Sequence, residues 1–357
     1  AMATNPMLLL SSPHTRTIAR DTSLDPKAAA KALSRYWECR EAMFGNAAFS
    51  EGVFSQPTHA DFVRYYDRCL RVSSDPVVEE ASRSLAAEFV RCVNQAKIDA
   101  LDQITTLASA KDAEELWDAQ KRAPDLANTD EIKLQFLKCE EFVEVKAAIR
   151  MMKYWKLKYM LFGKEVACQR MVLGDMISGD ERLLKLGVQR IMPGSDESGR
   201  CIFVISSAML LDQDWDDDHL LRALWYAIHL AMERESCKKN GLVIIINHRG
   251  TSLEILGRYP RETTQVMLVS AMPLKICAAH MLIEPSTWWQ MMFATTISFV
   301  TRLLKMRTMC HSNTEEKPTS TLGRFGIPRD QLPHELGGEA KIEHWCQWLE
   351  QHRDFSL

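Results

Sequence analysis

Residue types able to do chemistry gather most densely in the acidic run DQDWDDDH at 212–219. Asp212, Asp214 and Asp216 take positions 1, 3 and 5 of a calcium-binding loop, but such a loop also needs Gly at position 6 and Glu at position 12. This chain has Asp217 and Ala223 at those places. We therefore expect no calcium site and predict that the acids begin a helix, whose positive end favours carboxylates.

Two other segments carry reactive residue types at unsuitable spacing. In CAAH, Cys277 and His280 are three apart in a predicted strand, so they point to opposite faces and cannot share a metal ion. Ser252 lies in GTSLE, where Glu254 replaces the second Gly of a hydrolase nucleophile elbow. The sequence contains neither G-x-x-x-x-G-K-[ST] nor G-x-G-x-x-G for binding phosphates. We expect no catalytic site, no metal and no cofactor, and hence no enzyme.

Composition narrows the class of protein further. A net charge of −3 over 357 residues argues against nucleic acid as a partner, because proteins that bind nucleic acids need a dominant basic surface. The ten cysteines stand singly with no C-x-x-C pair, which is typical of reduced thiols in a cytoplasmic protein. The first 20 residues lack acids and contain Ser, Thr and Arg, so organelle targeting by a transit peptide stays an alternative.

The elements expected to position any site change in kind along the chain. Residues 1–125 have helical periodicity, and RYWECREAMFG at 35–45 returns as KYWKLKYMLFG at 153–163, which indicates a partial duplication. After about residue 185, short apolar runs at 201–205, 242–247, 275–283 and 307–311 alternate with helices at 216–239 and 261–272. The segment MPGSDESGR at 192–200 predicts a turn between strands. This alternation predicts an α/β fold with a mostly parallel sheet flanked by helices, joined to an all-helical N-terminal region.

One segment is unusually apolar. Residues 285–304, PSTWWQMMFATTISFVTRLL, hold Arg302 as their only ionisable side chain. The length reaches that of a membrane span. A permanent span is not expected, because the segment contains the polar side chains of Gln290, Thr295, Thr296, Ser298 and Thr301. A helix that is apolar on most sides needs apolar surroundings on two of them. A sheet on one side and a ligand or a membrane on the other would supply them.

Five motifs in order resemble those of the CRAL-TRIO family of lipid-binding and lipid-transfer proteins, the relatives of the cellular retinaldehyde-binding and tocopherol-transfer proteins. They cover roughly residues 115–350: LQFLKCEEFVEVKAAIRMMKYW (134–155), SGR before CIFVI, KKNGLVIIIN, MPLKICAAHMLIEP and FGIPRDQLPHELGGE. The resemblance implies a helical N-lobe at 115–180, a lipid-binding domain at 181–340 and a C-terminal helix at 341–357. Residues 1–114 lie outside the family pattern and are expected to form a helical N-terminal extension.

The resemblance also implies a hydrophobic cavity above the sheet, closed by a mobile gate helix at 286–305. When open, that helix would make transient peripheral contact with a membrane through its Trp and Phe side chains. His280 and Ser270 are candidate polar contacts to the ligand. The apolar residues expected to bind it are Leu221, Leu224, Trp225, Ile228, Leu242, Ile244, Ile246, Cys277, Ala279, Met281, Ile283, Trp288, Met292, Phe293 and Phe299.

Departures from the family pattern favour a neutral ligand. Where phosphatidylinositol-transferring members carry basic residues after the Phe-Leu motif, this chain has Glu140 and Glu141, and it has Leu274 where they have Glu. Acids cannot replace cations around a phosphate. We therefore expect non-catalytic binding and intermembrane transfer of a neutral lipid or isoprenoid rather than a phosphoinositide. The alternative is a regulatory scaffold with a closed pocket, whose N-terminal helices bind a protein partner.

Overall fold

The structure is a computed structural model that describes residues 76–176, 178–284, 307–312, 317–351 and 353, together with 27, 30, 31, 33 and 34. The chain divides into two compact units. One consists of Ala1–Leu107 and Glu140–Ala147, and the other of Ala108–Cys139 and Ala148–Leu357. The four-part division expected from the sequence stays a prediction.

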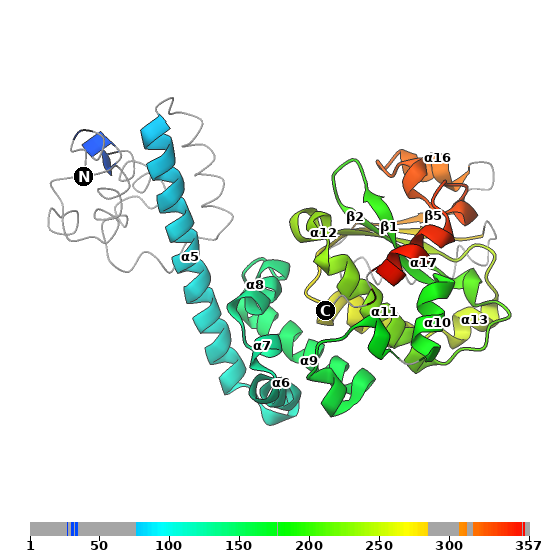
Figure 1. Cartoon of the computed structure of the whole chain (residues 1–357), viewed down its shortest axis with the longest axis horizontal. Helices are drawn as coiled ribbons and strands as arrows, with labels where there is room; N and C mark the ends of the chain where they lie inside the picture. Colours follow the sequence, from blue (N-terminus) through cyan, green and yellow to red (C-terminus); the bar gives the residue numbers. More distant parts are fainter. Residues whose placement is uncertain are drawn as a thin grey trace. The chain divides into compact units, whose positions relative to one another are not determined.

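The first unit contains one long helix, α5 (Pro76–Leu107), shown in cyan in Figure 1. Its last third buries Ile98 and Leu101. Within the same unit, the Nζ of Lys97 lies 2.6 Å from Oε1 of Glu144. Both side chains are about one-quarter exposed, so this ion pair contributes only modestly to stability.

The second unit opens with helices, as the sequence predicts. They are α6 (Ala110–Arg122), α7 (Pro124–Ala127), α8 (Asp130–Cys139), α9 (Glu144–Ala167, whose first turn belongs to the first unit), η3 (Leu173–Asp175) and α10 (Ser178–Leu186). Amphipathic spacing explains their packing: α6 buries Ala113, Leu116 and Ala119 on one face and exposes charged residues on the other. In α9, the fully buried Trp155 faces the interior.

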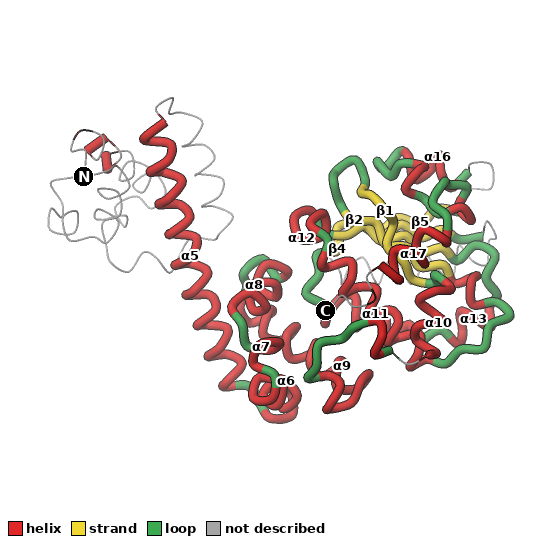
Figure 2. The backbone as a smooth tube through the Cα atoms, viewed as in Figure 1, coloured by secondary structure: helices red, strands yellow, loops and turns green. Residues whose placement is uncertain are grey.

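A five-stranded sheet follows, with strands β1 (Gln189–Ser195), β2 (Cys201–Ser206), β3 (Leu242–Asn247), β4 (Ile276–Leu282) and β5 (Arg307–His311) in that order across it. β1 is antiparallel to β2, and the remaining pairs are parallel. The expected α/β fold with a mostly parallel sheet is therefore confirmed (Figure 2). Gly241 leads into β3 with φ of +82°, and a Cβ there would lie 2.6 Å from the carbonyl oxygen of Lys275.

Two local predictions need correction. Residues 192–200 were expected to form a turn, but β1 continues to Ser195, so the turn begins later. The side chain of Asp196 stabilises it: Oδ1 accepts the backbone N–H of Ser198 at 3.0 Å and that of Arg200 at 2.8 Å. The helix expected at 216–239 is two helices, α11 (Asp217–Glu233) and α12 (Glu235–Asn240), separated by extended backbone at Arg234.

The acidic run does begin a helix. Oδ1 of Asp216 accepts the backbone N–H of His219 at 2.8 Å and caps α11, while Asp217 and Asp218 occupy the first turn. Short elements complete the crossovers: η4 (Ser207–Leu210), α13 (Leu253–Arg258), α14 (Arg261–Gln265) and the π-helical turn η5 (Val266–Ala271). The last two fill the helix predicted at 261–272.

Each face of the sheet has its own covering layer. Figure 1 shows α10, α11 and α13 on one side of the sheet and α16 (Pro318–Gly323) on the other. The second layer also contains η6 (Arg329–Gln331) and η7 (His334–Leu336), whose neighbourhood buries Ile327, Leu332 and Leu336 against Ile202 and Ile245. The two faces therefore pack against different parts of the chain.

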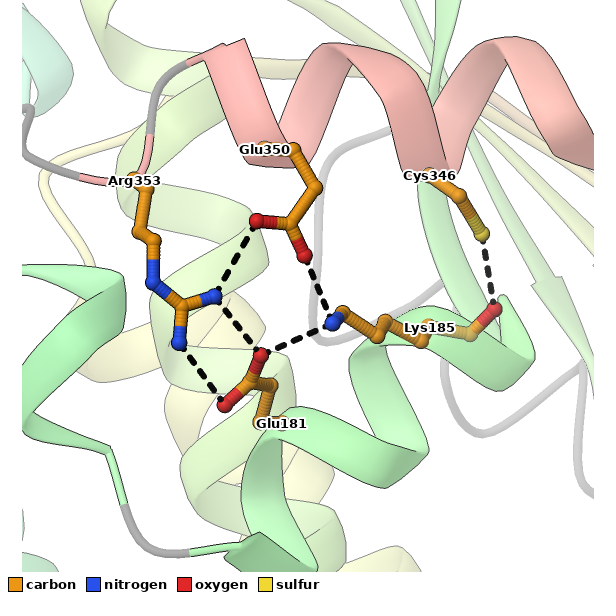
Figure 3. A network of polar contacts seen from close by, with 5 residues as sticks. All are labelled: Glu181, Lys185, Cys346, Glu350 and Arg353. Atoms are coloured by element: carbon orange, nitrogen blue, oxygen red, sulfur yellow. Dashed lines mark hydrogen bonds and ion pairs between the residues drawn. The ribbon is translucent and has the colours of Figure 1, made fainter.

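The C-terminal helix α17 (Ile342–Gln351) is held to α10 by buried and exposed contacts (Figure 3). Nε1 of the buried Trp345 donates to the carbonyl oxygen of Leu184 at 2.7 Å. Around it, Lys185 pairs with Glu181 at 2.9 Å and with Glu350 at 2.6 Å. The indole supplies the core contact, and the charged groups form a rim in solvent.

Candidate ligand-binding face

The candidate face is built from side chains that alternate along three parallel strands. The register pairs Ile244 of β3 with Ala279 of β4, and Ala279 with Thr308 of β5. Two residues further along each strand, Ile246 pairs with Met281, and Met281 with Cys310. Because side chains two apart share a face, these residues form two adjacent rows on one side of the sheet.

Burial decreases across these rows. Phe203, Ile244 and Ala279 of the first row are at most 2% exposed, and Thr308 is half-buried. In the second row Ile246 and Met281 are half-buried, and Cys310 is exposed. The face is thus closed at its centre and open towards the carboxyl-terminal half of β3, β4 and β5. We call the residues Ile246, Met281, Thr308 and Cys310, which lie beside the buried Ala279, the open corner.

Helix α11 closes the central part of the same face. Its predicted stripe Leu221, Leu224, Trp225 and Ile228 belongs to one core cluster with Leu242 and Ile244, and all six side chains are at most 4% exposed. The structure therefore brings the predicted helix stripe and the predicted β3 residues together as close-packed core. Only Ile246, at the end of that strand, remains partly accessible.

Two neutral polar atoms lie among these apolar residues. The Oγ1 of Thr308 in β5 and the indole Nε1 of Trp225 in α11 are buried and have no hydrogen-bond partner within the described part of the chain. A buried polar atom without a partner costs about 1–3 kcal/mol. A ligand with a hydroxyl or carbonyl group would relieve that cost. Thr308 and Cys310 were not among the residues predicted from the sequence, although alternation in the predicted strand 307–311 places them on one face.

Of the other sequence-predicted residues, Cys277 and Ile283 do not belong to the two rows. A β-bulge in β4 makes Cys277 an extra residue, and its thiol donates to the carbonyl oxygen of Asn240 at 3.3 Å, at the amino end of β3. Ile283 follows β4 and is buried, with its N–H donated to the carbonyl oxygen of His311. Trp288, Met292, Phe293 and Phe299, with the rest of the expected gate helix at 286–305, lie outside the described residues.

His280 occupies the opposite face of the sheet from the open corner. Its Nδ1 lies 3.0 Å from Nε2 of His311, the two rings stack at 5.3 Å, and Phe325 packs against both. Burial and the neighbouring His311 lower the pKa of His280 to about 4. This ring is a core histidine satisfied by its neighbour, rather than a polar contact on the open corner.

The helical surroundings of the face are anchored by Arg150 of α9. Its two terminal nitrogens each donate at 2.7 Å to the carbonyl oxygens of Met272 and Val269, which end the π-helical turn η5. A guanidinium at the C-terminal end of a helix satisfies carbonyls that have no helical partner. The hydrogen bonds made by Arg150 therefore fix the helical segment that leads into β4.

A buried polar cluster lies behind α11. The Nδ1 of His229 donates to the carbonyl oxygen of Trp225 at 2.9 Å, which leaves Nε2 to accept from the hydroxyl of Tyr154 at 2.9 Å. Burial lowers the pKa of His229 to about 4 and raises that of Tyr154. Both groups are therefore neutral at physiological pH, and they position Trp225 by stacking, with ring centroids 5.0 Å apart for His229.

Taken together, a mostly parallel sheet covered on both faces, an apolar corner left open on one of them and neutral polar groups beside it form an α/β domain with one candidate ligand-binding face. Residues 187–338 match the CRAL/TRIO domain. The resemblance expected from the sequence is confirmed.

Relatives agree with this assignment at a distance. The chain is 23% identical over 169 residues to an alpha-tocopherol transfer protein-like protein of Mus musculus and equally to those of Homo sapiens and Pongo abelii. The aligned part is 46% of this chain, and the chain spans about half the length of these curated relatives, 48%. Among the helices the structure describes, none combines the length and apolar character that crossing a bilayer requires.

Proposed function

We propose that the protein is a non-catalytic carrier that takes one neutral lipid or isoprenoid from a membrane, shields it and releases it at another membrane. The observation that carries this proposal is the open corner. Next to it Ala279 is only 2% exposed, whereas Met281 is half-buried and Cys310 is exposed. Apolar surface withdrawn from water there would contribute about 25 cal/mol per Å² to binding.

The charge of the face supports a neutral ligand. All residues in its two rows are uncharged, and the polar atoms without partners, Thr308 Oγ1 and Trp225 Nε1, suit a hydroxyl or carbonyl group. The acids Glu140 and Glu141 stand where phosphoinositide carriers have cations. A ligand without a charged headgroup avoids the desolvation penalty that an anion would suffer against such a surface.

Exchange with membranes is assigned to residues 286–305 on their sequence. Their Trp and Phe side chains suit the interface between water and lipid, since an indole is apolar with one hydrogen-bond donor. In this proposal the segment covers the ligand in the loaded protein and rests on the membrane during transfer. In this proposal the protein is cytoplasmic and binds membranes transiently as a peripheral protein.

Native mass spectrometry after exposure to a total lipid extract tests the proposal directly. The expected result is one stoichiometric apolar species, recovered by organic extraction and identified by its fragments. A protein that stays empty contradicts the proposal. It would favour the alternative of a scaffold, which the dense packing around Leu224 and Trp225, both at most 1% exposed, also supports.

A matched pair of variants tests where the ligand sits. Ala279→Trp places a large side chain on the proposed face, whereas Ala278→Trp places it on the opposite face one residue away. Both positions are at most 7% exposed, so overpacking should destabilise both variants by about 1–3 kcal/mol. At equal folded fraction, we expect loss of lipid uptake in Ala279→Trp alone. Equal uptake by both variants contradicts the assignment of this face.

A further inference from the structure

A second cavity lies on the other side of the sheet from the open corner. It has a volume of 520 Å³ and is entered at the carboxyl ends of β2 and β3, where Ser206 and Asn247 end the strands, with Leu336 and Pro318 among its walls. Ser206 and Asn247 pair in register and share the face of Ile202 and Ile245, away from Ala279. Carboxyl ends of parallel strands are the usual place for ligands in open α/β sheets.

Three hydrogen-bond donors of the cavity are unused within the described residues. Asn247 is only 4% exposed; its Oδ1 accepts the backbone N–H of Arg249 at 3.2 Å, and its amide nitrogen makes no hydrogen bond there. The guanidinium of Arg249 is half-buried and forms no ion pair in the described part of the chain. The same holds for the ammonium of Lys317 across the cavity, which is exposed.

The carboxylates of the cavity, in contrast, already have partners. Oε1 of Glu284 accepts the backbone N–H of Gly250 at 2.8 Å. Oε1 of Glu335 accepts the hydroxyl of Ser206 at 3.2 Å, and Glu335 also forms an ion pair with the buried Arg190. Arg190 therefore compensates the negative charge of Glu335. The lining then keeps the two positive charges of Arg249 and Lys317 against the one negative charge of Glu284, so its net charge favours an anion.

We propose that this cavity binds a small soluble phosphate monoester of a polyol. Arg249 and Lys317 would hold the phosphate oxygens from two sides, and the amide nitrogen of Asn247 would donate a third hydrogen bond. The remaining oxygen of Glu284 would accept a hydroxyl group of the polyol. The volume fits a small ligand, for which cavities of about 300–1,000 Å³ are usual. This site is independent of the proposed lipid carrier function, since it rests on the opposite face of the sheet.

Isothermal titration of the full chain with glycerol 3-phosphate, at constant ionic strength, tests the inference. We expect saturable one-to-one binding, and no binding of glycerol itself. Arg249→Gln and Lys317→Gln should each weaken the affinity at least about tenfold. Arg249→Lys should weaken the affinity less than Arg249→Gln, because it keeps the charge. Some loss is still expected, because a lysine cannot bind a phosphate in bidentate fashion. The control Lys341→Gln removes one charge from an exposed position and should leave the affinity unchanged.

Three results overturn the inference. The first is absence of saturable binding up to about 10 mM ligand, because a site with a millimolar dissociation constant would be saturated there. The second is an equal loss of affinity in Lys341→Gln, which would indicate a general charge effect. The third is unchanged affinity in a folded Arg249→Gln. A parallel arm uses vesicles of phosphatidylcholine with and without phosphatidic acid. Binding to the acidic vesicles alone, with none to glycerol 3-phosphate, would assign the phosphate to a lipid headgroup and refute the soluble ligand.

Discussion

Mild acid should destabilise this protein, because its fold keeps buried histidines neutral. His229 and His248 are both enclosed, and burial lowers the pKa of each from the ordinary value near 6.5 to about 4. His229 is held by Trp225 and Tyr154, and Nδ1 of His248 lies 3.0 Å from the hydroxyl of Ser207. Protonation would place an uncompensated charge in each of these environments.

The size and sign of the effect follow from linkage. A histidine whose folded pKa is lowered stabilises the fold above its unfolded pKa, and this contribution is lost as the pH falls from about 6.5 to about 4. Between pH 7 and pH 5 each ring should cost about 2 kcal/mol of unfolding free energy, or about 4 kcal/mol for His229 and His248 together. That is a large share of a typical total of about 5–15 kcal/mol.

Urea denaturation followed by tryptophan fluorescence at pH 7, 6 and 5, at constant ionic strength, measures the loss. His229→Gln cannot titrate, whereas His248 and His280, whose pKa values are also about 4, still do. We therefore expect the variant to lose about 2 kcal/mol less stability than the unmodified protein between pH 7 and pH 5, or about two-thirds of the full loss. His344→Gln, at an exposed position, serves as the matched control and should show the full loss. The reasoning is refuted if His229→Gln loses as much stability on acidification as the control.

Two further predictions concern residues 286–305 and the C-terminal helix. Replacing Trp288 and Trp289 together with Ala should slow lipid transfer between vesicles more than it lowers equilibrium loading; equal transfer rates in a fluorescence assay would sink the idea that this segment docks on membranes. Trp345→Ala removes a buried indole and its hydrogen bond to Leu184, and should cost about 3–5 kcal/mol in denaturation. Glu350→Gln, in the exposed rim of the same helix, should leave the stability nearly unchanged, and a loss comparable to that of Trp345→Ala would show that the rim matters as much as the core.

Local sequence patterns were sufficient for the elements. The apolar runs at 201–205, 242–247 and 307–311 became β2, β3 and β5, because short β-branched and apolar runs between turns form strands wherever both faces can be covered. The acids before residue 219 became a capped helix start because an Asp at that place satisfies free N–H groups. These features depend only on neighbours in the chain.

The breaks inside elements were harder to predict. The division between α11 and α12 falls at Arg234, a good helix former, whose guanidinium donates to the carbonyl oxygens of Met192 and Pro193 on β1. The neighbouring residues do not predict this break, because the carbonyl groups that Arg234 binds lie about 40 positions away in the chain. The continuation of β1 to Ser195 likewise depends on pairing of Ser195 with Cys201, which overrides the turn-forming Pro and Gly of the segment.

The sequence by itself determined the α/β class, the parallel sheet, the family resemblance and the alternation that puts Ile244 with Ile246, and Ala279 with Met281. Alternation has a period of two within one strand, so it cannot say whether two strands turn the same face to the same side. Only the register decided that Ile246, Met281 and Cys310 form one row. The tertiary structure also decided which predicted residues are closed core and which form an open corner, because burial depends on what packs above them.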